Sequence, residues 1–245
     1  MIKIIVETQP ESQESIDDDD NSDPPDDLIE RIESDESSIT PYISDYEDFL
    51  NRSKANFNQE YEKKEKHNLK INYFDLIRTI GLGSFGQVVF AKFKKTSKHF
   101  AIKILPKEKI VHKQQVQHVT NEKNILKSIQ FPFIVTLQYN FQDTTNIYLV
   151  FEYLNGGELF NHLRNSGSLN ELTSRYYAGQ ICLVLEYLHF LNVIYRDLKP
   201  ENLVLDYDGN LKFVDFGFAK VLFLIKNAIK GKPERLDYCI NIIIP

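Results

Sequence analysis

Four polar residues between positions 197 and 215 have the side-chain types and the close spacing that phosphoryl transfer requires. The carboxylate of Asp197 can accept the proton of an attacking hydroxyl group, and Lys199 can hold phosphate charge. The side-chain oxygens of Asn202 and Asp215 are suitable ligands for Mg²⁺. This segment therefore predicts a site that transfers a phosphoryl group with the help of Mg²⁺.

A short β-hairpin is predicted between the two halves of this site. Apolar residues at 203–205 and 211 flank Asp208-Gly209, a dipeptide that favours a tight hairpin turn. The hairpin would place the 195–202 loop at one end and the Asp215 turn at the other. The spacing between the 195–202 loop and Asp215 is therefore the one that such a hairpin requires.

A glycine pattern, Gly81-x-Gly83-x-x-Gly86, lies far upstream and could hold phosphates, because glycine lets backbone N–H groups approach phosphate oxygens closely. On its own this pattern is weak, since three glycines at fixed spacing also occur by chance. The main alternative is a dinucleotide-binding turn, which requires a following helix and an acidic residue about twenty positions later. Here β-branched residues follow at 88–89 and Lys103 stands near the acidic position, so we favour a glycine loop between two strands.

Lys103 and Glu122 form a candidate ion pair between a predicted strand and the helix that follows it. A buried lysine held by a glutamate could place its ammonium against the α- and β-phosphates of a nucleotide. Each residue also has a simpler interpretation. Lys103 could reach water from a strand end, and Glu122 could be an exposed helix charge. In isolation neither residue decides between these interpretations.

The charge of the 245-residue chain is unevenly distributed. Residues 1–70 contain 8 basic and 20 acidic residues, whereas the remainder contains 21 basic and 15 acidic ones. From residue 7 to about residue 48, the Ser, Asp, Glu and Pro composition predicts disorder, because little apolar surface can offset the entropy of ordering. This arm is either a solvated tail or a segment that covers the basic body and competes with basic ligands. Residues 49–70 could form a helix.

The cysteines and the apolar runs favour an intracellular protein. Cys182 and Cys239 are too few for a disulfide framework and lack a spacing typical of zinc. No apolar stretch approaches the length that spans a bilayer, and the apolar run at the N-terminus is too short for a signal peptide. We expect a cytoplasmic location, with the nucleus as the alternative, and neither a nucleic-acid partner nor a membrane span.

The apolar patterns predict a strand-rich half followed by a helical half. Strands are expected at 74–80, 88–91, 100–105, 134–141 and 147–153, and helices at 118–129, 159–163 and 171–191. Pro106 is expected to end the third strand, and Gly156-Gly157 to break the chain between the halves. The predicted fold class is α+β, with two lobes.

Taken together, these motifs resemble the eukaryotic protein kinases, and within them the cAMP-dependent kinases of the AGC group of Ser/Thr kinases. The motifs that carry the resemblance are Phe74-Asp75, Asn121-Glu122-Lys123, Phe131-Pro132-Phe133, Glu152-Tyr153, Gly156-Gly157-Glu158-Leu159-Phe160, Tyr195 in place of the usual histidine, and Asp215-Phe216-Gly217-Phe218-Ala219-Lys220. The resemblance runs from about Tyr73 to Lys220. It implies a partial kinase domain at 71–220, with a complete β-rich small lobe at 71–152 and an incomplete helical large lobe at 153–220. Residues 1–70 would be an acidic, mostly disordered extension, and residues 221–245 a divergent tail.

The resemblance also implies a role for each residue of the site, with ATP and Mg²⁺ as cofactors. The catalytic set would be Asp197 as base, Lys199 as phosphate-side charge, Lys103 and Glu122 as the activating ion pair, and Asn202 and Asp215 as Mg²⁺ ligands. ATP would contact the glycine loop, the adenine pocket and the hinge: Ile80, Gly81, Leu82, Gly83, Ser84, Phe85, Gly86, Val88, Ala101, Lys103, Glu152, Leu154, Glu158 and Val204.

The resemblance further implies a protein substrate that is basic around its phosphoacceptor. Glu158 and Glu201 would contact arginines that precede the phosphoacceptor, although each could also be a solvated surface carboxylate. A cAMP-binding regulatory subunit is a further partner that the resemblance implies. Four residues resemble the apolar stack that links the lobes of kinases and would also fit an ordinary core: Leu126, Leu137, Tyr195 and Phe216.

The resemblance ends after Lys220. The residues that follow contain no Ser or Thr and no Ala-Pro-Glu motif, and Gly231-Lys232-Pro233-Glu234 only faintly resembles the family's Gly-Thr-Pro-Glu. A truncated gene product or gene model would explain this change. Two function hypotheses result. The first is an AGC-type Ser/Thr kinase, and the second is a truncated, weakly active or inactive fragment that binds a nucleotide or a partner.

Overall fold

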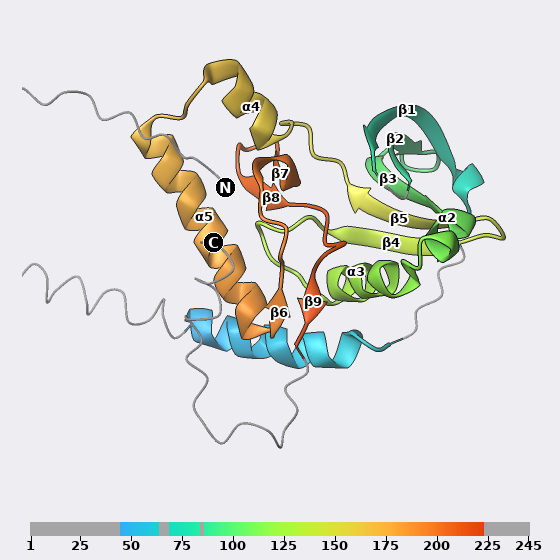
Figure 1. The fold of residues 1–245 in the computed structure, drawn as a ribbon, viewed down its shortest axis with the longest axis horizontal. Coiled ribbons are helices and arrows are strands. Elements are labelled where there is room, and N and C mark those ends of the chain that lie inside the picture. The colour runs from blue at the N-terminus through green and yellow to red at the C-terminus, as the bar shows by residue number, and fades with distance from the viewer. Residues whose placement is uncertain (1–44, 64–68, 84–85, 223–245) are drawn as a thin grey trace, which may run out of the picture.

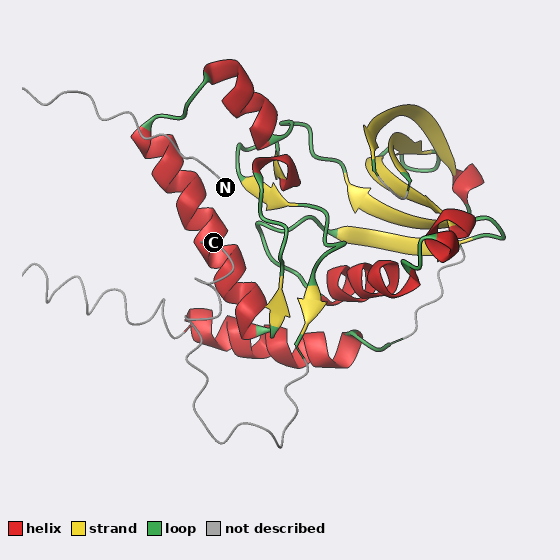
Figure 2. Cartoon of the chain, viewed as in Figure 1, coloured by secondary structure: helices red, strands yellow, loops and turns green. Residues whose placement is uncertain are grey.

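The computed structural model describes residues 45–63, 69–83 and 86–222. The first half forms one antiparallel sheet with strand order β1-β2-β3-β5-β4, and helices dominate the second half (Figure 1; Figure 2). The strands are β1 (Phe74–Leu82), β2 (Gln87–Phe93), β3 (His99–Pro106), β4 (Leu137–Gln142) and β5 (Asn146–Glu152), and a short 3-10 helix, η1 (Ile71–Tyr73), precedes them. The predicted α+β architecture with a strand-rich and a helical lobe is confirmed.

The sheet buries one face in a small core of its own. Along β3, Phe100, Ile102 and Ile104 are buried in this core. Because successive residues of a strand point to opposite faces, Ala101 and Lys103 lie on the other face. The alternation of β3 therefore turns Lys103 away from the apolar core and toward the site described below.

Two elements differ from the sequence-based expectations. Helix α2 (Lys107–His112) directly follows β3 and was not expected. Pro106 ends the strand as predicted, but its φ of −62° also suits the position that starts this helix. The strand expected at 134–141 begins only at Leu137, because Ile134 is buried and forms an isolated bridge with Phe213 of the other lobe. Helix α3 (Val116–Ser128) lies within two residues of its expected position.

The second lobe consists of two helices and short strand pairs. Helices α4 (Leu159–Ser166) and α5 (Glu171–Phe190) are followed by two short strand pairs. Strand β6 (Val193–Ile194) pairs with β9 (Lys220–Val221), and β7 (Leu203–Leu205) pairs with β8 (Leu211–Phe213). The 3-10 helix η2 (Pro200–Asn202) precedes β7. The Asn170 side chain caps α5 by accepting a hydrogen bond from the Thr173 backbone N–H at 2.8 Å. Gly209 has a φ of 82° between β7 and β8, so the predicted hairpin is present.

Across the described ranges, no helix combines the length and the apolar character that crossing a bilayer demands.

Residues 45–60 form a helix that packs beside the C-terminal end of α5 and near α3 (Figure 1). Leu50 and Phe57 are buried in the same core as these helices. The composition predicted disorder to about residue 48, and for residues 45–48 this was wrong. Tyr46 donates a hydrogen bond to Glu186 at 3.2 Å, and the adjacent Phe49 ring packs on the core, so this segment has partners that its composition does not reveal. Residues 7–44 of the predicted disordered arm and residues 223–245 of the tail lie outside the described residues.

The turn between β4 and β5 is organised by Asp143. Its carboxylate accepts hydrogen bonds from the backbone N–H of Asn146 (2.7 Å), the hydroxyl of Tyr148 (2.7 Å) and the backbone N–H of Thr145 (2.8 Å). These bonds favour the charged form and lower the pKa of Asp143 from 3.8 to about 2. The stability that they supply is therefore present above the unfolded-state pKa and is lost as the pH falls through about 2.

We expect an NMR titration of the Asp143 side-chain carboxyl carbon to give a pKa near 2. Tyr148→Phe removes one of the donors, so it should raise this value without changing the fold. A wild-type pKa at the ordinary value of 3.8 would show that the bonds do not form in solution.

Candidate active site

The loop between β6 and η2 holds the carboxylate of Asp197 with two neighbouring side chains. The amide nitrogen of Asn202 donates to Asp197 Oδ2 at 2.7 Å and to the Asp197 backbone carbonyl at 2.9 Å. The ammonium of Lys199 lies 2.9 Å from the same Asp197 oxygen. Asn202 is buried, whereas Asp197 is only half-buried. The loop therefore presents one carboxylate, that of Asp197, which is oriented by the Asn202 amide and lies beside the Lys199 ammonium.

The turn that carries Asp215 is bound directly to this loop. The Tyr195 hydroxyl donates to the Val214 carbonyl at 2.5 Å, and the Arg196 guanidinium donates to the Phe218 carbonyl at 2.7 Å. Arg196 and Asp215 both have positive φ values, of 67° and 54°. Backbone strain of this kind persists only where surrounding contacts enforce it, and it concentrates at functional sites.

Lys103 joins the two lobes through a pair of ionic contacts. Its ammonium lies 2.6 Å from Glu122 Oε1 on α3 and 3.2 Å from Asp215 Oδ1 in the other lobe. The Glu122 side chain is only 3% exposed, so it is not an exposed helix charge. Lys103 is directed at these two carboxylates rather than at open water. The structure thus brings together three residues that are far apart in the sequence.

These contacts shift the pKa values of all three groups. Burial alone would lower the pKa of Lys103, but the charges of Glu122 and Asp215 outweigh this effect and raise it. Burial raises the pKa of Glu122, and Lys103 opposes that shift. Burial would also raise the pKa of Asp215, but attraction to Lys103 and the Gly217 backbone N–H lower it. At neutral pH Lys103 is therefore cationic and Asp215 is ionised.

The glycine loop lies between β1 and β2, as expected. The Gly83 backbone N–H donates to the Gly86 carbonyl at 2.9 Å, which closes the turn. A Cβ atom at Gly86 would overlap the backbone carbonyl of Ile104 on β3, so only glycine fits there. Ile80 and Leu82 are exposed on β1, and residues 84–85, predicted to contact ATP, lie outside the described residues.

The residues predicted to surround adenine come from both lobes. On β2, Val88 pairs with Lys103, and Ala101 of β3 lies on the same sheet face as that lysine. Val204 of β7 forms an isolated bridge with Glu158. The Glu152 carboxylate is occupied elsewhere, since it accepts a hydrogen bond from the Thr136 backbone N–H at 2.8 Å. The Glu152 backbone N–H is also engaged, because it donates to the Thr136 carbonyl at 3.2 Å.

The two predicted substrate residues lie on neighbouring elements. Glu158 is exposed at the start of α4, and Glu201 is exposed in η2, which packs against that helix. This placement would give an approaching chain two carboxylates on one side of the catalytic loop.

The four residues predicted to stack between the lobes belong to one core. Leu126, Tyr195 and Phe216 are buried, and Leu137 packs against their cluster. The rings of Tyr195 and Phe216 meet edge to face, with centroids 5.0 Å apart. This packing fixes the position of Tyr195, which precedes Arg196, and of Phe216, which follows Asp215.

Three contacts of the site were not anticipated. They are the direct Lys103 to Asp215 ion pair, the Arg196 to Phe218 hydrogen bond, and the ion pair of Lys212 with Glu152 at 3.5 Å. Each joins residues at least 22 positions apart. No local sequence signal could have identified them.

The donor set of the loop and the turn fits Mg²⁺. Asp215 carries a carboxylate and Asn202 supplies an amide oxygen, and both are the hard oxygen ligands that Mg²⁺ takes. Among the described residues, no group of three or more His, Cys, Asp or Glu side chains could hold a metal by itself. Mg²⁺ usually keeps several waters and substrate phosphates and takes only one or two protein carboxylates.

Residues 74–230 match the family model of the protein kinase domain. The chain therefore belongs to the protein kinase family. The match extends ten residues beyond Lys220 and includes the glycine loop, Lys103, Glu122 and the catalytic loop.

Among individual proteins, the chain is similar to cAMP-dependent kinases, as predicted. It is 45% identical over 161 residues to the cAMP-dependent protein kinase catalytic subunit 3 of Drosophila melanogaster, and the aligned region covers 66% of this chain and 28% of that protein. It is 44% identical over 164 residues to the human cAMP-dependent protein kinase catalytic subunit PRKX, covering 66% of this chain and 46% of that protein. The chain is 38% identical over 219 residues to a protein of Caenorhabditis elegans named cAMP-dependent protein kinase, catalytic subunit-like. This aligned region covers 85% of this chain and 55% of that protein. The chain thus matches between about a quarter and about half of the length of these relatives.

Proposed function

We propose that this chain transfers the γ-phosphoryl group of ATP to a Ser or Thr hydroxyl of a protein, as an AGC-type kinase. One observation carries this proposal. Lys103, Glu122 and Asp215 form a single ion-pair network across both lobes, and the turn that bears Asp215 is bound to the loop in which Asn202 holds Asp197.

Each group of the site has a defined task under this proposal. Bound Mg²⁺ would neutralise charge on the transferring phosphoryl group, and Asp215 and Asn202 are the residues that would hold it. The cationic Lys103 would hold nucleotide phosphates. Asp197 would accept the proton of the attacking hydroxyl, and Lys199, beside it, would stabilise the charge on the phosphoryl group.

We further propose a protein substrate with basic residues near its phosphoacceptor. Glu158 and Glu201 are exposed on adjacent elements, so both carboxylates are free to pair with arginine side chains. Because the relatives are named catalytic subunits of cAMP-dependent kinases, we include a cAMP-binding regulatory subunit as a proposed partner. The low cysteine content supports an intracellular, cytoplasmic location.

Two measurements on the purified chain test the proposed activity. With Mg-ATP and a peptide that carries arginines before a serine, we expect phosphate transfer that is lost in Asp215→Asn. Mg-ADP at about 100 times its Kd should stabilise the wild-type fold by about 2.7 kcal/mol, measured by thermal unfolding. Stabilisation without any transfer would reject the kinase and support the nucleotide-binding fragment. Absence of both would reject both hypotheses.

A further inference from the structure

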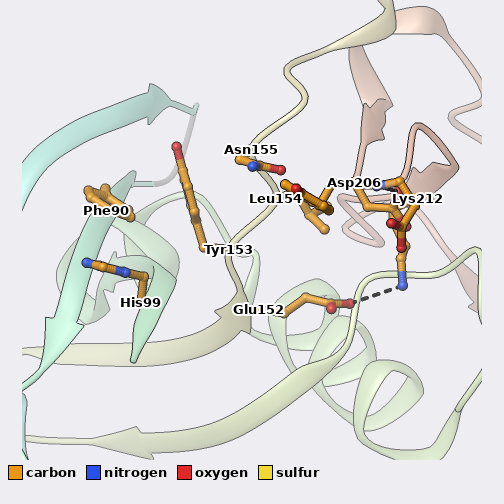
Figure 3. A pocket seen from close by; sticks show the side chains of 10 residues that line it. Phe90, His99, Glu152, Tyr153, Leu154, Asn155, Asp206 and Lys212 are labelled. Atoms are coloured by element: carbon orange, nitrogen blue, oxygen red, sulfur yellow. Dashed lines mark hydrogen bonds and ion pairs between the residues drawn. The ribbon is translucent and has the colours of Figure 1, made fainter. Parts of the chain in front are cut away.

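A groove lies beside the connection between β5 and α4. Its lining includes Glu152 and Leu154, which were predicted to contact ATP, but no residue of the glycine loop, the catalytic loop or the Asp215 turn. Its volume is about 440 Å³. It is lined by residues of both lobes, among them Phe90, His99, Tyr153, Asp206, Asp208 and Lys212 (Figure 3). We call this the hinge groove. Lys103, Asp197 and Asp215 do not line it.

One wall of the hinge groove is aromatic. The ring of Tyr153 packs on Phe90 with centroids 4.3 Å apart, and His99 stacks on the same ring at 5.1 Å. In Figure 3 Tyr153 lies between Phe90 and His99 on one side and Asp206 on the other. The guanidinium of Arg78 already lies 5.8 Å from the Phe90 ring, so a cation is accepted by this cluster.

The opposite wall is acidic. Asp206 uses Oδ1 to accept hydrogen bonds from the backbone N–H groups of Asp208 (3.0 Å) and Asn210 (2.9 Å), which orients its carboxylate. Asp208 is exposed, and within the described residues its carboxylate has no cationic partner. The one lysine of the groove, Lys212, is paired with Glu152. Two carboxylates of the groove therefore remain without a counter-charge.

We propose that the hinge groove binds an arginine side chain from a basic segment of a partner protein. A guanidinium could stack on the Tyr153 ring while its N–H groups face Asp206 and Asp208. Arginine suits this arrangement better than lysine, because its planar head stacks on a ring and donates several hydrogen bonds at once. The charge of the groove selects a cation, and its volume accommodates a side chain with adjoining backbone.

This proposal does not depend on the proposed kinase activity. Arginine recognition for phosphorylation would use Glu158 and Glu201, and neither lines the hinge groove. The two sites can therefore be separated by variants. The groove can bind a basic segment whether or not the chain transfers phosphate.

Fluorescence anisotropy with a labelled Gly-Arg-Gly-Arg-Gly peptide tests the proposal on the full chain. This peptide has no hydroxyl that could be phosphorylated. We expect it to bind at least about threefold more tightly than the same peptide with citrulline, which keeps the shape and removes the charge. Asp208→Ser and Tyr153→Leu should each weaken binding by about threefold or more, whereas Tyr153→Phe should keep it, because the ring remains.

Two control variants locate the binding. Glu108→Gln removes the same charge from an exposed position on α2, and Glu201→Gln removes a carboxylate of the proposed substrate site. Both should bind the peptide within about twofold of wild type. Thermal unfolding checks that the variants are folded.

Several outcomes would overturn the proposal. The first is equal binding of the arginine and citrulline peptides, and the second is an equal loss of peptide binding in Glu108→Gln and Asp208→Ser. The third is a loss of peptide binding in Glu201→Gln alone. The fourth is no binding of the wild type at millimolar peptide. The first would show that charge is not recognised, and the second would show a general charge effect. The third would place the peptide at the substrate site.

Discussion

Replacing Asp197 with asparagine is expected to lower the turnover number for peptide phosphorylation by about 10² to 10⁴, the range that a positioned general base contributes. Asn keeps the size of the side chain and an oxygen that can still accept the hydrogen bond from Asn202, which is 2.7 Å long in the wild type. It cannot accept the proton of the substrate hydroxyl. Steady-state kinetics with Mg-ATP and the arginine-containing serine peptide measure the effect.

Nucleotide binding should survive this substitution. Lys103, Glu122 and Asp215 are unchanged in Asp197→Asn, so stabilisation by Mg-ADP in thermal unfolding should remain close to that of wild type. Asp75→Asn is the control for a lost surface carboxylate, since Asp75 is half-exposed and only 3.5 Å from Lys94 in a surface ion pair. Its turnover should equal that of wild type. Turnover of Asp197→Asn within threefold of wild type would refute the role of Asp197 as base.

Replacing Tyr187 with alanine is expected to lower the free energy of unfolding by about 3 to 5 kcal/mol, as for other large aromatic residues in cores. Tyr187 is 1% exposed and lies between three parts of the chain. Its ring stacks on Phe131 with centroids 4.4 Å apart and on Phe49 of the 45–60 helix at 6.0 Å. Alanine would leave a cavity where α5, that helix and the segment after α3 meet.

Tyr187→Phe is the matched control, because it keeps the ring. It removes only the hydroxyl, which accepts from the Gln130 backbone N–H at 3.3 Å and donates to the Gln130 carbonyl at 3.4 Å. The expected loss is about 0.5 to 1.5 kcal/mol. Urea unfolding of the three proteins gives these differences. A loss below about 1 kcal/mol in Tyr187→Ala would show that this junction does not form in solution.

Much of the fold was predictable because its signals are local. Alternating apolar residues identified β2, β3 and β5, and Asp208-Gly209 identified the turn between β7 and β8. Helix α2 was missed because Pro106 is compatible both with the end of a strand and with the start of a helix. The strand at 134–141 was drawn too long because Ile134 is apolar for a contact with the other lobe, which no local pattern reveals.

The sequence by itself singled out the candidate site residues of this kinase-family chain. These are the glycine loop, Lys103, Glu122, Asp197, Asn202 and Asp215, which all stand in short motifs whose spacing is set by one turn or one strand. Only the tertiary structure decided how they meet. Lys103 reaches Asp215 across 112 positions, and Tyr153 shares the hinge groove with Asp206 and Asp208. Such contacts depend on how the two lobes pack, and packing is a collective result of many buried side chains rather than of any one motif.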